Sequence, residues 1–277
     1  MLDKFHYDQF RQQGYVVVPN FVTDSLVEQA RERFDPLFRG EFETGIQPDE
    51  WNWQHGKSDP SLTRQICNGW KADRTIARLV LSQEVGKDCA LLMNWDGSRI
   101  NQDNVIWKPP GAKPLGFHQD NTYQQWIDPP SMVTCWMALD DTHPDGGTIE
   151  YVTGSHNWPV SSELHGFHAP EDYHEGLHSA AESLGVAEYE VVKLKVNAGD
   201  AVFHHGGTWH GSGSNRTENP RRSVVAHCMN SESRHHPTNL SPIYSRYKKQ
   251  NSLELDESFF PVLWHKNGHR TAFLDRD

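Results

Sequence analysis

The sequence predicts a mainly β protein, an antiparallel barrel or jelly roll with helices on one face. Helical patterns fall before residue 82, and a series of short strand-like runs follows, separated by Gly, Pro, Asn and Asp. Helices followed by many short strands are typical of this fold class. A chain of 277 residues with 36% hydrophobic residues can bury one large core. We therefore expect one domain over residues 1–277.

The N-terminal third is expected to pack helices against the first strand. Helical spacing or capping patterns occur in three segments: residues 4–13, 25–40 and 73–81. Ser25 with Glu28 matches a capping box at the start of the second segment. The β-branched run at residues 15–19 predicts a strand. Residues 41–60 are polar and rich in Trp, so we expect a long loop that covers a functional site.

The strand-like runs share apolar, β-branched or aromatic side chains over short lengths. They lie at residues 89–95, 104–108, 117–120, 132–139, 148–152, 191–196, 201–205 and 222–229. Residues 157–189 are expected to be an insertion between two of these strands that contributes to substrate binding.

Charge and composition exclude several classes of protein. The formal net charge of -11 and the lack of a Lys/Arg block argue against a nucleic-acid partner. No apolar run approaches the length that spans a membrane. The four cysteines are widely spaced without a CxxC pair, which favours a reducing, cytoplasmic setting. A small-molecule partner is expected, and the oligomeric state is left open.

A metal site is predicted from three residues. On a strand, side chains two apart point to the same face, so His118 and Asp120 can converge on one ion. His-x-Asp is a weak motif in a chain with 17 histidines, but Gln119 and Asn121 make this run polar on both faces. His210 is the proposed third ligand. Two imidazoles and one carboxylate form the facial triad of non-haem Fe(II) oxygenases.

The surroundings of His210 support its selection from a crowded set of histidines. Gly211-Ser212-Gly213 follows it, and small residues let a ligand approach the backbone closely. The other histidines of this region are interpreted as surface or hydrogen-bonded structural groups: His204, His205, His227, His235 and His236. Arg221 lies on the next predicted strand, where its guanidinium can bind a dicarboxylate co-substrate through two hydrogen bonds.

These motifs together resemble the phytanoyl-CoA dioxygenase family of Fe(II)/2-oxoglutarate oxygenases. The resemblance rests on His118-Gln119-Asp120, His210-Gly211-Ser212-Gly213 and Arg221. It implies a double-stranded β-helix (a cupin-like jelly roll), Fe(II) as cofactor, and 2-oxoglutarate and O2 as co-substrates. It further implies hydroxylation of a C–H bond with release of succinate and CO2. The family pattern places Fe(II) at His118, Asp120 and His210, and 2-oxoglutarate near Gln119, Trp136, Ser212 and Arg221.

The substrate is expected to be a small polar metabolite with an anionic group. The candidate lining residues form a polar and partly cationic set: Arg99, Asn104, Trp107, Lys108, Asn121, Tyr123 and His205. The regions 107–111 and 117–121 are similar to bacterial aminophosphonate hydroxylases of the family. This suggests 2-aminoethylphosphonate or an N-methylated analogue, while acyl-CoA, amino-acid and natural-product substrates stay open.

Two alternative functions remain. His174-Glu175-Gly176-Leu177-His178 matches the H-E-x-x-H motif of zinc metallopeptidases, although Gly176 weakens a helix there and no third ligand follows at a recognised spacing. A non-catalytic metal-binding barrel is the other alternative, because a metal site can persist without turnover.

Overall fold

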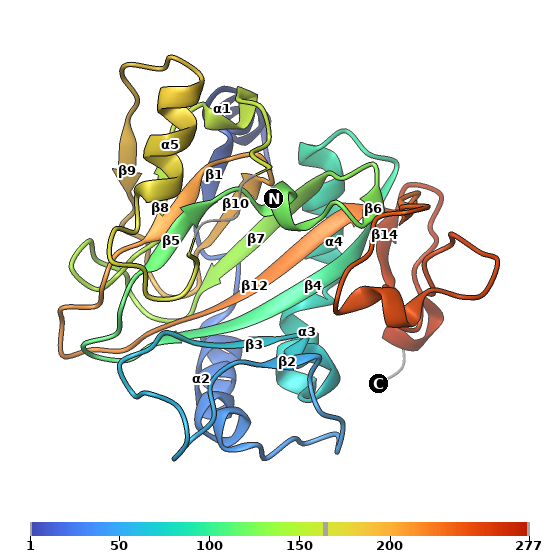
Figure 1. Cartoon of the computed structure of the whole chain (residues 1–277). Helices are drawn as coiled ribbons and strands as arrows, with labels where there is room; N and C mark the ends of the chain where they lie inside the picture. The colour runs from blue at the N-terminus through green and yellow to red at the C-terminus, as the bar shows by residue number, and fades with distance from the viewer. Residues whose placement is uncertain (1, 163–165, 276–277) are drawn as a thin grey trace.

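The computed structural model describes residues 2–162 and 166–275 and consists of two facing antiparallel sheets (Figure 1). The large sheet has the order β1 (Tyr15–Val18), β10 (Ala201–His205), β7 (Met132–Ala138), β12 (Arg221–Asn230), β4 (Gly97–Lys108), β3 (Arg64–Cys67), β2 (Glu50–Trp51), and β14 (Val262–His265) also pairs with β4. The small sheet has the order β5 (Leu115–His118), β11 (His210–Ser212), β8 (Glu150–Val152), β9 (Val191–Lys193). This arrangement is a jelly roll, which confirms the predicted fold class.

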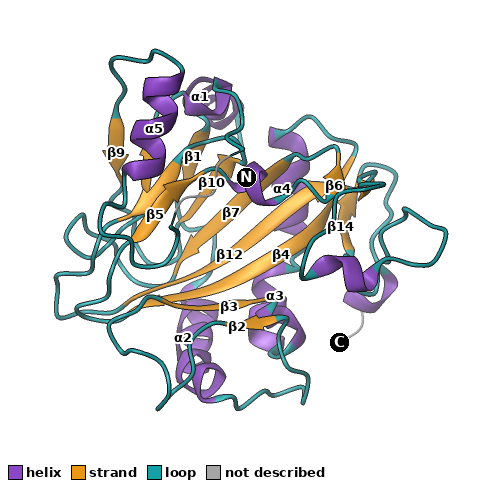
Figure 2. Cartoon of the chain, viewed as in Figure 1, coloured by secondary structure: helices purple, strands orange, loops and turns teal. Residues whose placement is uncertain are grey.

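Helices cover the outer face of the large sheet (Figure 2). The α-helices of the described residues are α1 (Lys4–Gln13), α2 (Asp24–Arg39), α3 (Arg74–Val80), α4 (Gln83–Leu92) and α5 (Glu175–Ser183). Helix α1 contacts the edge strand β1, and α2, α3 and α4 pack against the outer face of the large sheet. Helix α5 contacts β5 of the small sheet. β6 (Ile127–Asp128) and β13 (Arg234–His235) form a separate two-stranded sheet, and Ile127 packs in one cluster with Met229 of β12. No helix among residues 2–162 and 166–275 is long and apolar enough to cross a bilayer.

The alternation of side chains gives the large sheet two different faces. On β12, Val224 and Ala226 point outward into the core that α2, α3 and α4 close. Arg221, Val225 and His227 point inward, toward the small sheet, and line a cavity. One strand therefore supplies both the hydrophobic core and the site.

Helix α4 corrects one prediction, because residues 89–95 were expected to be a strand. Val85, Cys89 and Leu92 are buried at helical spacing, and the Ser82 hydroxyl caps the helix by accepting from the Val85 amide at 3.2 Å. The short apolar run fits a helix and a strand equally well by pattern alone. The Ser82 cap and the helical turn that begins at Gln83 decide in favour of a helix.

The expected cover at residues 41–60 is also wrong. These residues include strand β2, and their indoles pack on the helix-covered side of the large sheet, with Trp51 against Phe42 at 5.3 Å and Trp53 against Phe38 at 6.2 Å between ring centroids. The start of α2 differs slightly from the predicted capping box, since Thr23 accepts from the Leu26 amide.

The packing of α2 gives a stability prediction. Leu37 is fully buried in the core, so Leu37→Ala should lower the free energy of unfolding by about 2–5 kcal/mol through lost burial and a residual cavity. The matched control Leu240→Ala, with a side chain 72% exposed, should change it by less than about 0.5 kcal/mol. Urea denaturation of both variants measures this, and equal destabilisation would contradict the assignment of the core.

Candidate active site

The three predicted metal ligands come together where the small sheet ends. His118 is the last residue of β5, and His210, the first of β11, pairs directly with it. Asp120 was expected on the same strand as His118, but it is the first residue of the 3-10 helix Asp120–Tyr123. The ligand nitrogens and the carboxylate oxygen lie within 4.8 Å of one another. This is the one group of three or more potential ligands within residues 2–162 and 166–275.

Both imidazoles are oriented by backbone carbonyls. His118 Nδ1 lies 2.9 Å from the Gly116 carbonyl oxygen, and His210 Nδ1 lies 2.9 Å from that of Thr208. Each Nδ1 therefore carries the proton and donates it, which leaves the Nε2 lone pair free for a metal. The Nε2 atoms lie 3.6 Å (His118) and 3.7 Å (His210) from Asp120 Oδ1. All three lone pairs thus face one centre.

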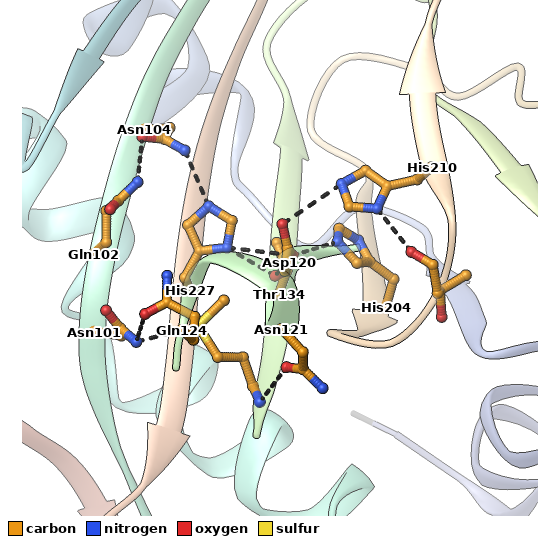
Figure 3. Close-up of polar contacts among 12 residues, drawn as sticks. Asn101, Gln102, Asn104, Asp120, Asn121, Gln124, Thr134, His204, His210 and His227 are labelled. Atoms are coloured by element: carbon orange, nitrogen blue, oxygen red, sulfur yellow. Dashed lines mark hydrogen bonds and ion pairs between the residues drawn. The ribbon is translucent and has the colours of Figure 1, made fainter. Parts of the chain in front are cut away.

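The two carboxylate oxygens of Asp120 have different environments. Oδ1 faces the imidazoles, whereas Oδ2 accepts from the Thr134 hydroxyl at 2.6 Å and from His204 Nε2 at 3.0 Å (Figure 3). Burial favours a raised pKa for Asp120, but the surrounding imidazoles, His227 first, outweigh it and hold that pKa well below its usual range. The carboxylate is therefore charged at neutral pH.

The His210 imidazole is suited to metal binding for the complementary reason. Burial, then the neighbouring rings of His118 and His204, hold the pKa of His210 well below its usual range, so the ring is neutral at pH 7. Two neutral imidazoles and one carboxylate form the donor set that accommodates Fe(II) with open positions.

A cavity of about 510 Å³, open to solvent, extends from these ligands over the inner face of the large sheet. Arg221 closes one end and donates to the Gly147 carbonyl through Nε (3.0 Å) and Nη2 (2.9 Å) and to Ser223 Oγ at 3.0 Å. Burial lowers the pKa of Arg221 to about 10, so the guanidinium stays charged at neutral pH. Trp136 lies 5.7 Å from it, measured to the ring centroid, and Ser212 also lines the cavity.

Gln119, predicted to contact 2-oxoglutarate, does not line this cavity. Its Nε2 donates to the Gly207 carbonyl at 2.7 Å, and its Oε1 accepts from the Ser161 amide at 2.8 Å. Gln119 follows the end of β5 and lines a smaller neighbouring pocket instead, so its contact with 2-oxoglutarate stays a prediction without support from the cavity lining.

Arg99, Trp107 and Lys108, which were predicted to contact substrate, do not line this cavity. Arg99 reaches the Leu255 carbonyl at 3.5 Å, outside the cavity. Lys108 is fully buried and donates to the carbonyls of Ser212, at 3.2 Å, and Gly213. Trp107 points to the helix-covered side and stacks with a guanidinium there. Both predicted cations are therefore bound to backbone oxygens and do not reach the cavity.

Of the remaining predicted substrate residues, only Asn104 lines the main cavity. Asn121 accepts from the Met132 amide at 3.0 Å, and His205 Nδ1 accepts from the Gly207 amide at 3.0 Å. Tyr123 packs its ring edge-on against His118, with centroids 5.8 Å apart, at a smaller neighbouring pocket. These three residues shape the loops around the site from outside the cavity.

Several cavity residues were not predicted from the sequence. They come from strands of both sheets and from the insertion: Gln65, Ile106, Leu115, Thr134, Ile149, Phe167, His204, Val225 and His227. Counting by twos along the strand from Arg221 would have reached Val225 and His227, and counting back from Trp136 would have reached Thr134. His204 and His227 are hydrogen-bonded as expected, but at the candidate metal site.

The glycine after His210 lines the cavity and has a structural role as well. A Cβ on Gly211 would lie 2.6 Å from the Phe117 ring on the adjacent strand β5. The close approach of two strands therefore requires glycine here, and a ligand is not needed to explain it.

The H-E-x-x-H segment does not form a zinc site. Helix α5 begins at Glu175, so His174 lies in front of the helix, where its ring stacks on Phe117 at 4.9 Å. The His178 side chain is 58% exposed. The Asp172 carboxylate lies 3.9 Å from Nδ1 of each histidine, but these residues do not converge as a ligand group, which the described residues form at His118, Asp120 and His210.

The fold and this site define an Fe(II)- and 2-oxoglutarate-dependent dioxygenase. The family model for phytanoyl-CoA dioxygenase (PhyH) matches residues 10–223, and the chain belongs to this family. It is 23% identical over 274 residues to the dioxygenase olcK of Penicillium canescens, covering 96% of this chain and 80% of that protein.

Two further proteins are similar to this chain, one in sequence and one in structure. The methylphosphonate hydroxylase of Gimesia maris is 24% identical over 226 residues, covering 78% of this chain and 76% of that protein. The crystal structure of the epimerase SnoN with Fe3+, alpha ketoglutarate and nogalamycin RO has a TM-score of 0.69 at 22% identity, covering 94% and 98% of the two chains. The epimerase shares this fold and the hydroxylase is similar in sequence, so these similarities alone do not fix the reaction.

The ligand geometry predicts the effect of removing one imidazole. His210→Ala should weaken Mn(II) or Co(II) binding by at least about 100-fold, more than loss of a supporting hydrogen bond causes. Equilibrium dialysis under anaerobic conditions measures this. His178→Ala is the matched control and should leave the Kd unchanged. Weaker binding in His178→Ala alone would move the metal to the H-E-x-x-H segment.

Proposed function

We propose that this chain hydroxylates an aliphatic C–H bond of a small polar metabolite, with Fe(II) held by His118, Asp120 and His210. The observation that carries the proposal is the convergence of three lone pairs at one end of a cavity whose other end is a buried guanidinium. A metal ion and an anionic co-substrate would fill these two ends. Bound Fe(II) with 2-oxoglutarate would supply the oxidising chemistry, with succinate and CO2 as products.

The chain's own residues would orient the co-substrate and exclude water. Arg221 would bind the distal carboxylate of 2-oxoglutarate, and its two bonds to Gly147 fix the plane of the guanidinium before binding. Ser212 would add a hydroxyl donor, and Trp136 an apolar wall. The aliphatic lining, including Ile106 and Val225, would exclude water from this part of the cavity when the co-substrate is bound.

The substrate would bind near the amides of the cavity. Gln65 and Asn104 lie on the neighbouring strands β3 and β4 and both line it. These groups offer hydrogen bonds without charge, which favours hydroxyl, amide or amine groups. The methylphosphonate hydroxylase among the relatives supports a phosphonate such as 2-aminoethylphosphonate or an N-methylated analogue. A phosphonate there would have to share Arg221 with 2-oxoglutarate, because Arg221 is the one lysine or arginine among the described residues that line the cavity.

A coupled assay tests the proposed reaction. Succinate formation from 2-oxoglutarate with anaerobically loaded Fe(II), followed by exposure to O2, is measured across phosphonates, carnitine-like amines, amino acids and neutral polar compounds. One class should stimulate succinate formation and gain one oxygen atom per succinate, and His210→Ala should abolish both. Metal and 2-oxoglutarate binding without turnover of any compound would favour the non-catalytic barrel.

Arg221 gives a prediction with a matched control on the adjacent residue. Arg221→Lys should raise the Kd for 2-oxoglutarate about 10- to 100-fold, because lysine keeps the charge but loses the two-pronged contact. Arg222 points to the opposite face and pairs with Asp140 at 2.7 Å. Arg222→Lys should leave this Kd within about twofold, as binding to the metal-loaded protein would show. An equal increase of this Kd in both variants would contradict the assignment of Arg221 to the co-substrate site.

A further inference from the structure

We propose that His227 is a positioning residue for Asp120, and that a one-way chain of hydrogen bonds holds this carboxylate so that only Oδ1 faces the metal. The inference rests on the proposed metal site and extends it across three strands to the C-terminal segment. The chain, here called the donor chain, consists of Tyr244, Gln102, Asn104, His227 and Thr134, in that order toward Asp120.

The contacts of the donor chain from Gln102 to Asp120 are short and continuous (Figure 3). Gln102 Nε2 lies 2.9 Å from Asn104 Oδ1, and Asn104 Nδ2 lies 3.0 Å from His227 Nε2. His227 Nδ1 lies 2.8 Å from Thr134 Oγ1, which lies 2.6 Å from Asp120 Oδ2. The Tyr244 hydroxyl donates to Gln102 Oε1 at the far end.

The direction of donation follows from the chemistry of the groups. A carboxylate only accepts, so the single hydroxyl proton of Thr134 points to Asp120. Thr134 Oγ1 must then accept from His227 Nδ1–H. The amide nitrogen of Asn104 has no lone pair to offer, so His227 Nε2 is the acceptor and carries no proton. Both neighbours of His227 therefore specify the same tautomer.

The same logic applies on the other side of Asp120. His204 Nε2 donates to Oδ2 at 3.0 Å, and His204 Nδ1 lies 2.8 Å from the Tyr151 hydroxyl, which donates to it. Asp120 Oδ2 thus accepts two strong hydrogen bonds and has its lone pairs occupied. Oδ1 is left for the ion, so Asp120 would bind as a monodentate ligand.

Burial makes the links nearest Asp120 costly to lose, whereas Gln102 is only half-buried. Thr134 and Asn104 are 0% and 7% exposed, and Tyr244 is 2% exposed within a cluster that includes Trp126 and Phe260. A buried donor or acceptor that loses its partner cannot form a replacement hydrogen bond with bulk water. Bonds in such a chain also polarise one another, so a change at Tyr244 is felt at Thr134.

His227 lines the cavity, yet it is not free to bind substrate through its ring nitrogens. Both are occupied, by Asn104 and by Thr134. A substrate contact through either nitrogen would break the donor chain. This distinguishes a positioning residue from a substrate ligand and leads to a direct test.

The test compares metal affinity in variants of the donor chain. His227→Leu and Thr134→Val should each raise the Kd for Co(II) about tenfold, as loss of a bond to a metal ligand does. His227→Asn should restore most of the affinity, because its amide N–H can replace Nδ1–H. Tyr244→Phe should raise the Kd less than Thr134→Val does. In the unaltered protein, ¹⁵N NMR should show His227 protonated at Nδ1 only.

The control is Tyr247→Phe, which removes a hydroxyl from the same 3-10 helix (Tyr244–Tyr247). That hydroxyl donates to Asp49 and not to the donor chain, so the Kd should not change. Variants that remain folded with an unchanged Kd, or His227→Asn and His227→Leu that weaken binding equally, would overturn the inference. If the unaltered protein and His210→Ala bind Co(II) equally, the proposed metal site fails instead.

Discussion

The site depends on the two carboxylate oxygens of Asp120 having different contacts. One oxygen faces the His118 and His210 nitrogens, and the other is held by Thr134 and His204. A buried carboxylate is costly unless its charge is compensated. The imidazoles and hydroxyl that compensate it come from β5, β7, β10, β11 and β12, so the charge can be buried only when both sheets are assembled.

The jelly roll makes this possible because the two faces of the large sheet have different functions. Outward side chains such as Val224 and Phe203 bind the helices, while their neighbours Val225 and His204 face the cavity. The period of two keeps the hydrophobic core and the polar site apart, although they lie within one residue of each other in sequence. Helices on the outer face stabilise the sheet, and the inner face is free to hold polar groups.

The sequence predicted the strands well where alternation and turn residues agreed, as for residues 201–205, which form β10. It failed at residues 89–95, because a short apolar run has no period of its own and the deciding cap, Ser82, lies upstream. It also failed at residues 41–60, where Trp53 looked like part of a cover but packs on α2. Aromatic composition does not say which face of a sheet a loop will reach.

The candidate ligand set could be predicted from the sequence, because His118, Asp120 and His210 carry local signals: a His-x-Asp spacing and a histidine before small residues. Strand alternation, which is also a local property, placed Arg221 and Arg222 on opposite faces of their strand. The groups that meet Asp120 Oδ2 could not be predicted, since Thr134 and His204 lie 14 and 84 residues away in the chain. The folded chain likewise turns Gln119 and Lys108 away from the cavity toward backbone oxygens. Such contacts depend on the register between strands that are distant in sequence, and no local pattern encodes that register.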